Sequence, residues 1–221
     1  IRLLQQEAAL SWPTAFGENH LDQPVVPQHL VEIVARFTRL VRESSHVDSR
    51  SGVSARFAIA GLETVAASAV RRAAVAGELR PVARVVDLPS IVPASRGKVE
   101  FSDLATDTED GREVEILEHL LRRSVARTFR RHLAGVDLSG LQAAFADGTT
   151  VEAGDAVSAA DLLRQLGPVP GLAHILERLG VPDGAESPGL AAAVCEFAME
   201  GLHLNRRLAK DSADGRTRYG A

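Results

Sequence analysis

The chain has 221 residues, of which 45% are hydrophobic and 24% are charged, and its formal net charge is −4. This composition is typical of a globular protein, and the small negative charge excludes a general attraction to nucleic acid or to an acidic membrane. The only cysteine, Cys195, excludes an internal disulfide and a cysteine-rich zinc site. We find no run of 18 apolar residues and no signal peptide, and therefore expect a cytoplasmic protein without a membrane partner.

The first residues of the chain indicate that it belongs to a longer protein. The first ten residues, IRLLQQEAAL, have the apolar pattern of a short helix and lack an initial methionine. Residues 11–27 contain three prolines among polar turn residues and are interpreted as a loop or linker. We therefore expect the chain to be part of a longer protein.

The pattern after this linker predicts two amphipathic helices and a less regular segment. Apolar residues recur with a period of 3.6 from Pro27 to about Ser44. A second, alanine-rich helix follows a turn and continues to about Gly77. We expect a short helix over 82–86, and a short strand or extended connector over 98–101.

The second half of the chain predicts further helices. A strongly periodic helix is expected over about 112–134, after an acidic and mobile segment at 102–111. Shorter helices are expected from about 137 to 147, after a capping box that begins at Ser158, and over 171–180. A last helix is expected from Ser187 to about Lys210, followed by a frayed tail. The chain is therefore predicted to be all-α, with no strand beyond a short one near 98–101.

Several kinds of active site are absent from the sequence. A phosphate-binding P-loop requires G-x-x-x-x-G-K-[ST], and neither Lys98 nor Lys210, the only lysines, lies in such a motif. The segment ARVVDL has Leu88 where a magnesium-binding acidic pair would need its second acid. The seven histidines lack metal-ligand spacing, so no metal site is expected. The chain by itself is therefore not expected to bind and hydrolyse a nucleotide by this route.

An arginine-rich stretch, RRSVARTFRRH (122–132), lies in the strongest predicted helix. Four of its arginines project opposite the apolar face: Arg123, Arg127, Arg130 and Arg131. Glutamates at the start of the helix and arginines at its end match the helix dipole, and no aromatic side chain lies among the arginines. A solvated face is the first interpretation, and a surface for a protein partner is the second. A nucleic-acid-binding domain is the third, and we do not expect a nucleic-acid partner.

The alanine-rich helix begins unusually, with SGVSARF at residues 51–57. Arg56 lies in its first turn, where the unpaired N–H groups already carry partial positive charge. An arginine at this position is favourable when an anion binds at the helix start, because the guanidinium and the N–H groups both attract the anion.

These residues carry a resemblance to a known family. Residues 27–101 resemble the helical lid of AAA+ ATPases of the magnesium chelatase I-subunit and MoxR-like clade. In that clade a lid helix is followed by a turn and a helix that opens G-x-S-x-R, which residues 52–56 match. The stretch DLPSIVPASRGKVEF is similar to the last segments of the lid in chelatase-like proteins.

The resemblance implies a role for each residue near this turn. Arg56 would be the sensor-2 arginine that reaches the γ-phosphate of ATP. Ser54 would cap the helix, and Arg50 would be a second contact to phosphate or to a neighbouring subunit. ATP and Mg²⁺ would be bound mainly by an upstream core that this chain lacks.

The resemblance also implies an organisation and a function. Residues 1–26 would be the end of the ATPase core and a linker, 27–97 the lid, and 98–221 a C-terminal helical extension. The full-length protein would form a homo-oligomeric ring, a hexamer. It would couple Mg-ATP hydrolysis to remodelling or metal insertion in a partner with a von Willebrand A-type domain. The alternative is a non-enzymatic all-α protein-interaction module.

Overall fold

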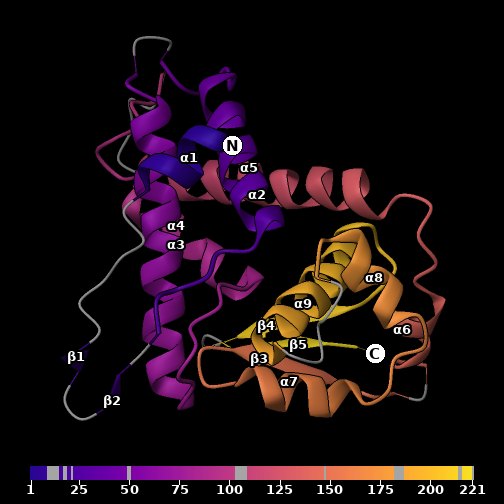
Figure 1. Ribbon diagram of the computed structural model, residues 1–221. Coiled ribbons are helices and arrows are strands. Elements are labelled where there is room, and N and C mark those ends of the chain that lie inside the picture. The colour runs from indigo at the N-terminus through magenta and orange to yellow at the C-terminus, as the bar shows by residue number, and fades with distance from the viewer. Residues whose placement is uncertain are drawn as a thin grey trace.

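A computed structural model describes residues 1–8, 15–16, 19–20, 22–48, 51–102, 109–146, 148–181, 187–213 and 216–220. Figure 1 shows a mostly helical protein with a small sheet near the C-terminus. The helices are α1 (Arg2–Glu7), α2 (Gln28–Arg42), α3 (Ala55–Ala76), the 3-10 helix η1 (Val85–Ser90), α4 (Ile91–Ala94), α5 (Glu109–Leu133), α6 (Ser139–Ala143), α7 (Ala159–Leu166), α8 (Leu172–Arg178) and α9 (Pro188–Leu204). The strands are β1 (Ala15–Phe16), β2 (Asn19–His20), β3 (Val151–Gly154), β4 (Lys210–Ala213) and β5 (Arg216–Tyr219).

The two helices expected after the linker are confirmed as α2 and α3. The face of α2 that contains Leu30, Ile33 and Phe37 is fully buried, as its period predicts. α3 ends at Gly77, which adopts a left-handed conformation with φ of 70° and closes the helix through its N–H. Its 22 residues make a rod about 33 Å long.

The segment after α3 differs in detail from the prediction. The short helix expected over 82–86 begins later, as η1, and continues directly into α4. Its start is fixed by Asp87, whose carboxylate accepts a hydrogen bond from the backbone N–H of Arg84 at 2.8 Å. Beyond α4, Lys98 lies in a turn, and Phe101 forms a single antiparallel bridge with Val47. Residues 98–101 therefore form the end of a turn followed by a connector, and not a strand.

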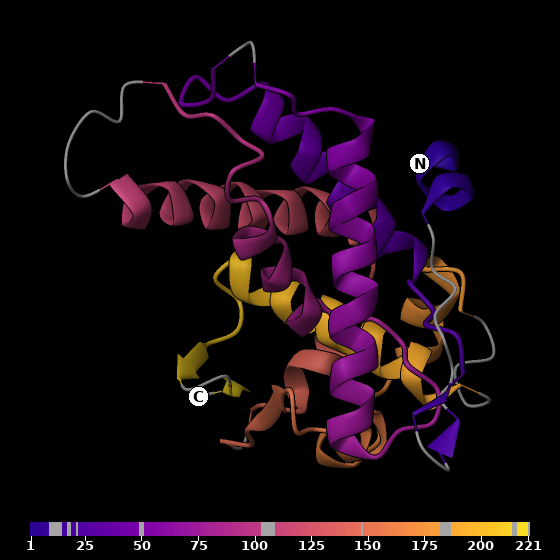
Figure 2. The same ribbon diagram turned by 90° about the vertical axis from the view of Figure 1, so that its left-hand side faces the viewer.

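The long helix α5 joins the two halves of the chain into one core. Figure 2 shows α5 running crosswise to α3. α5 packs against α2 on one side and α9 on the other, and the buried apolar cluster runs without interruption from α2 to α9. Residues 27–97 and 98–221 therefore share a hydrophobic core. The acidic segment 102–111 lies largely outside the described residues, although α5 begins within it.

The C-terminal tail corrects the prediction of an all-α chain. The last helix ends at Leu204, not near Lys210, and the tail expected to fray contributes β4 and β5. With β3 they form a three-stranded antiparallel sheet in the order β3-β5-β4. The physical reason is burial, because the Tyr219 side chain is 1% exposed and its hydroxyl donates to Glu200.

Candidate functional site

The residues assigned to nucleotide binding lie around the start of α3. Ser54 occupies the N-cap position, but its side chain accepts no capping hydrogen bond. Arg56 is exposed, and it makes no ion pair with another described residue. Val53, just before the helix, is buried and anchors the turn. Arg50 lies outside the described residues, so its proximity to Arg56 is not defined.

The opposite end of α3 carries a buried ionic cluster. Arg72 is completely buried, and its guanidinium donates to both oxygens of Asp87 at 3.3 Å and to Glu78 at 3.0 Å. Ser68 also donates to Asp87, at 3.0 Å. Burial opposes the charge of Arg72, but the carboxylates of Asp87, Glu196 and Glu78 together outweigh it and raise the pKa of the guanidinium. The end of α3 is thus fixed to η1 by a satisfied ion pair.

A second buried ion pair ties η1 to the C-terminal half. The Arg84 Nε atom lies 3.5 Å from Glu196 Oε2, and Arg84 also donates to the backbone oxygens of Gly154 and Val157. Glu196 accepts a hydrogen bond from the Val86 N–H at 2.6 Å. Burial lowers the pKa of Arg84 and raises that of Glu196, although each opposes the shift of the other. This pair is less well satisfied than the one between Arg72 and Asp87.

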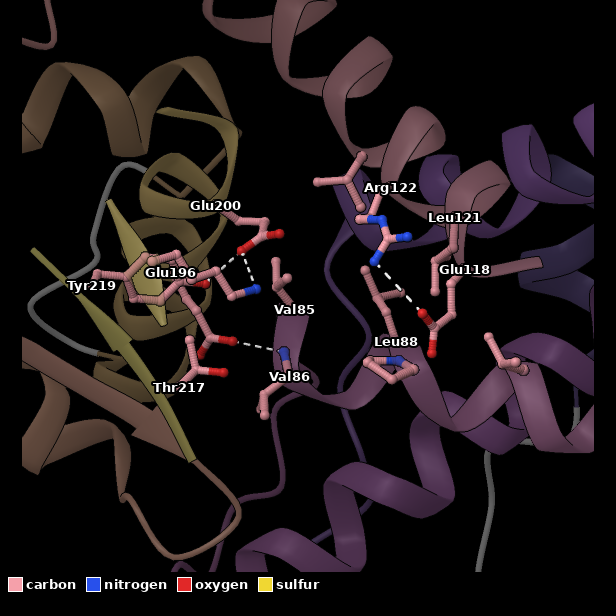
Figure 3. A pocket seen from close by; sticks show the side chains of 14 residues that line it. Val85, Val86, Leu88, Glu118, Leu121, Arg122, Glu196, Glu200, Thr217 and Tyr219 are labelled. Carbon is pink, nitrogen blue, oxygen red and sulfur yellow. Dashed lines mark hydrogen bonds and ion pairs between the residues drawn. The ribbon is translucent and has the colours of Figure 1, made fainter. Parts of the chain in front are cut away.

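A half-open cavity of about 220 Å³ adjoins this second pair. Figure 3 shows Glu196, Glu200 and Tyr219 on one side of it, and Leu88 with Leu121 on the other. The side chains thus come from four separate parts of the chain: η1, α5, α9 and the hairpin of β4 and β5. The wall with Glu196, Glu200 and Tyr219 is polar, whereas the other wall combines the apolar Leu88 and Leu121 with the charged Glu118 and Arg122. Apolar surface with a few polar groups is the usual composition of a ligand pocket.

The polar wall is itself held together by hydrogen bonds. Glu200 accepts from the Tyr219 hydroxyl at 2.7 Å and from the Lys210 ammonium at 2.8 Å. Burial and the neighbouring Glu200 carboxylate raise the pKa of Tyr219 well above its ordinary value. At neutral pH Tyr219 is therefore a protonated donor, and the wall is a fixed hydrogen-bonded unit.

The polar side chains on the described lining of the cavity are those of glutamate, arginine, lysine, threonine and tyrosine. Its described lining contains no serine, histidine or cysteine, so these residues do not form a nucleophile with a histidine base. Cys195, on the same helix as Glu196, is fully buried, and burial raises its thiol pKa to about 12. Its thiol therefore stays protonated and unreactive.

The buried ionic residues are functional candidates that the sequence analysis did not single out. A sequence signal for them exists, because Arg84 and Asp87 interrupt the apolar stretch PVARVVDL. Glu196 and Glu200 likewise stand four residues apart in the otherwise apolar helix α9. Charged residues in apolar runs are almost never fully buried without partners. Their partners, however, come from distant parts of the chain.

The arginines of α5 lie on its outer face, as predicted. Arg123, Arg130 and Arg131 are exposed, and Arg127 is half-buried. They lie outside the cavity lining, but Arg123 and Arg127 line a separate groove between α5 and the end of α2.

Comparisons with protein-family models, with curated proteins and with solved structures find no match to this chain. Within the part of the chain that the structure describes, no three His, Cys, Asp or Glu side chains gather as a metal site. No helix formed by the described residues has both the length and the apolar character needed to cross a membrane.

Proposed function

We propose that this chain is the lid and C-terminal helical domain of a chelatase-like AAA+ ATPase. In this proposal Arg56 reaches the γ-phosphate of ATP held by a preceding core domain. The observation that carries it is the start of α3, where an exposed arginine stands beside N–H groups that the Ser54 side chain does not cap. An anion placed there meets both a guanidinium and the positive end of a 22-residue helix.

The arrangement of the elements supports the same proposal. α2 and α3 are the two successive helices that the resemblance requires, and residues 52–56 lie where the second helix begins. The phosphate-binding loop and the magnesium-binding acids would belong to the core, because this sequence contains neither. When bound there, Mg-ATP would supply the phosphoryl chemistry, and Arg56 would stabilise the charge on the transferring phosphate.

Three further parts of the proposal rest on the resemblance alone. The full-length protein would assemble as a homo-oligomeric ring, a hexamer. It would act on a partner with a von Willebrand A-type domain. Hydrolysis would remodel that partner or drive metal insertion, and loss of the γ-phosphate would release the lid as a hinge.

The test is steady-state ATP hydrolysis by the full-length protein, compared with its Arg56→Ala variant. We expect the rate to fall at least about tenfold, equivalent to about 1.4 kcal/mol of transition-state stabilisation, with ring assembly by light scattering unchanged. Arg71→Ala is the matched control, because Arg71 is an exposed arginine of the same helix that pairs with Asp155 at 2.8 Å. Its hydrolysis rate is expected to match the unmodified protein.

Two results would contradict the proposal. Equal rates for Arg56→Ala and the unmodified protein would show that SGVSARF is only a helix start. Absence of nucleotide binding and hydrolysis in the full-length protein would favour the non-enzymatic helical interaction module instead.

A further inference from the structure

The groove between α5 and the end of α2 is a second feature that the proposed function does not use. It has a volume of about 670 Å³, and its walls carry three arginines, Arg112, Arg123 and Arg127. Ile116, which is partly exposed, contributes apolar surface to it, and the buried Leu40 and Leu120 lie at its base. We call this feature the arginine groove.

Positive charge predominates in the arginine groove, although the whole chain is negative. Its described lining includes two glutamates, Glu43 and Glu115, against the three arginines. Glu43 is already paired with Arg39 on α2, at 3.7 Å. Among the described residues, no acidic side chain forms an ion pair with Arg123 or Arg127, so guanidinium groups remain available to a ligand from outside.

The surroundings of the neighbouring Arg36 show the same excess of positive charge. Its Nε donates to Thr128 on α5 at 3.2 Å, which places it beside the arginine face. Its pKa is lowered by partial burial and by repulsion from Arg39, Arg131 and Arg127, with Glu32 opposing. Arginines from both α2 and α5 therefore lie near enough to repel one another, which favours binding of an anionic partner.

We propose that the arginine groove docks an acidic segment of a partner protein, one in which apolar side chains alternate with carboxylates. Arginines bind carboxylates through paired hydrogen bonds, and the partly exposed Ile116 would receive the apolar side chains. A nucleic acid fits less well. No phenylalanine, tyrosine or tryptophan among the described lining offers a base a stacking partner.

The experiment measures binding of a short fluorescent peptide of glutamate and leucine to the purified protein by fluorescence anisotropy. The comparison probes are the same peptide with glutamine in place of glutamate, and a single-stranded DNA oligonucleotide of equal charge. We expect the acidic peptide to bind more tightly than either probe, and to bind more weakly as salt is raised.

The variant that tests the site is Arg123→Glu combined with Arg127→Glu. We expect it to weaken peptide binding at least about tenfold, because two attractive charges become repulsive. The matched control is Arg178→Glu with Arg216→Glu, which makes the same change of charge at two exposed arginines outside the groove. It should bind the peptide as the unmodified protein does. Because surface charge reversals can disturb folding, Arg123→Gln with Arg127→Gln is included, and it should show a smaller loss.

Three outcomes would overturn the proposal. The first is that the acidic peptide binds no better than its glutamine version. The second is an equal loss in the groove variant and the control variant, which would mean that only net charge matters. The third is tighter binding of the oligonucleotide, which would identify the surface as a nucleic-acid site. Binding of the peptide to the arginine groove does not depend on Arg56 or on ATP hydrolysis. This proposal and the proposed ATPase function can therefore fail separately.

Discussion

Arg56 and Arg72 lie on the same helix, 16 residues apart, in opposite surroundings. Arg56 is exposed in the first turn of α3, without an ion pair to another described residue. Arg72 is completely buried near the other end and is bound by Asp87 and Glu78. The Arg72 guanidinium is thus held by buried carboxylates, and the Arg56 guanidinium is available to a ligand. Arginines of one helix can therefore serve structure or binding, and their surroundings distinguish the two roles.

The largest effect on stability is expected when the carboxylate partner of Arg72 is removed. Asp87→Ala leaves a buried guanidinium without its main carboxylate, and we expect the free energy of unfolding to fall by about 3–5 kcal/mol. Urea denaturation measures it. The matched control is Asp155→Ala, which breaks the exposed pair with Arg71 and should cost at most about 1 kcal/mol. Equal losses for the two variants would contradict the distinction between buried and exposed pairs.

Acid adds to the contrast by destabilising the buried interior. His29 is buried against Phe197, and burial together with nearby His132 lowers its pKa from 6.5 to about 3. The unfolded chain therefore binds a proton at mildly acid pH that the folded protein does not bind. This contribution to stability is complete above about pH 6.5 and is lost as the pH falls toward 3.

We expect His29 alone to lower the free energy of unfolding by on the order of 2 kcal/mol between pH 7 and pH 5. The comparison is His29→Leu, whose apolar side chain cannot take up a proton. Urea unfolding at the two pH values should show a smaller difference for this variant. If both proteins lose the same stability, His29 is not the group responsible.

The smallest effect on stability is expected at Arg56. Its exposed side chain has no described ionic partner, so Arg56→Ala should change the free energy of unfolding by no more than about 0.5 kcal/mol. Thermal or urea unfolding measures it. A stable variant with slowed ATP hydrolysis would assign Arg56 to the ligand. A loss of several kcal/mol would instead place Arg56 among the structural arginines.

The C-terminal hairpin shows where prediction from the sequence was incomplete. Asp214-Gly215, between β4 and β5 in the sequence, is a residue pair that favours hairpin turns. The adjoining segments are short and polar, however, and nothing local identifies β3, about sixty residues earlier, as their partner. The burial of the Tyr219 side chain, the hydrogen bonds of Tyr219 and Lys210 to Glu200, and the pairing of β5 with β3 hold this tail in place.

The sequence by itself determined the helical class, the positions of α2, α3 and α5, and the outward face of the α5 arginines. These features follow from local periodicity and from end signals such as Gly77, which act within one or two turns. The tertiary structure decided which charges are buried and where the cavity and the arginine groove lie. Arg72 and Arg56 look alike in sequence, because the Asp87 carboxylate reaches Arg72 only when η1 packs against α3. Such pairing depends on contacts between distant segments, which local residue patterns do not specify.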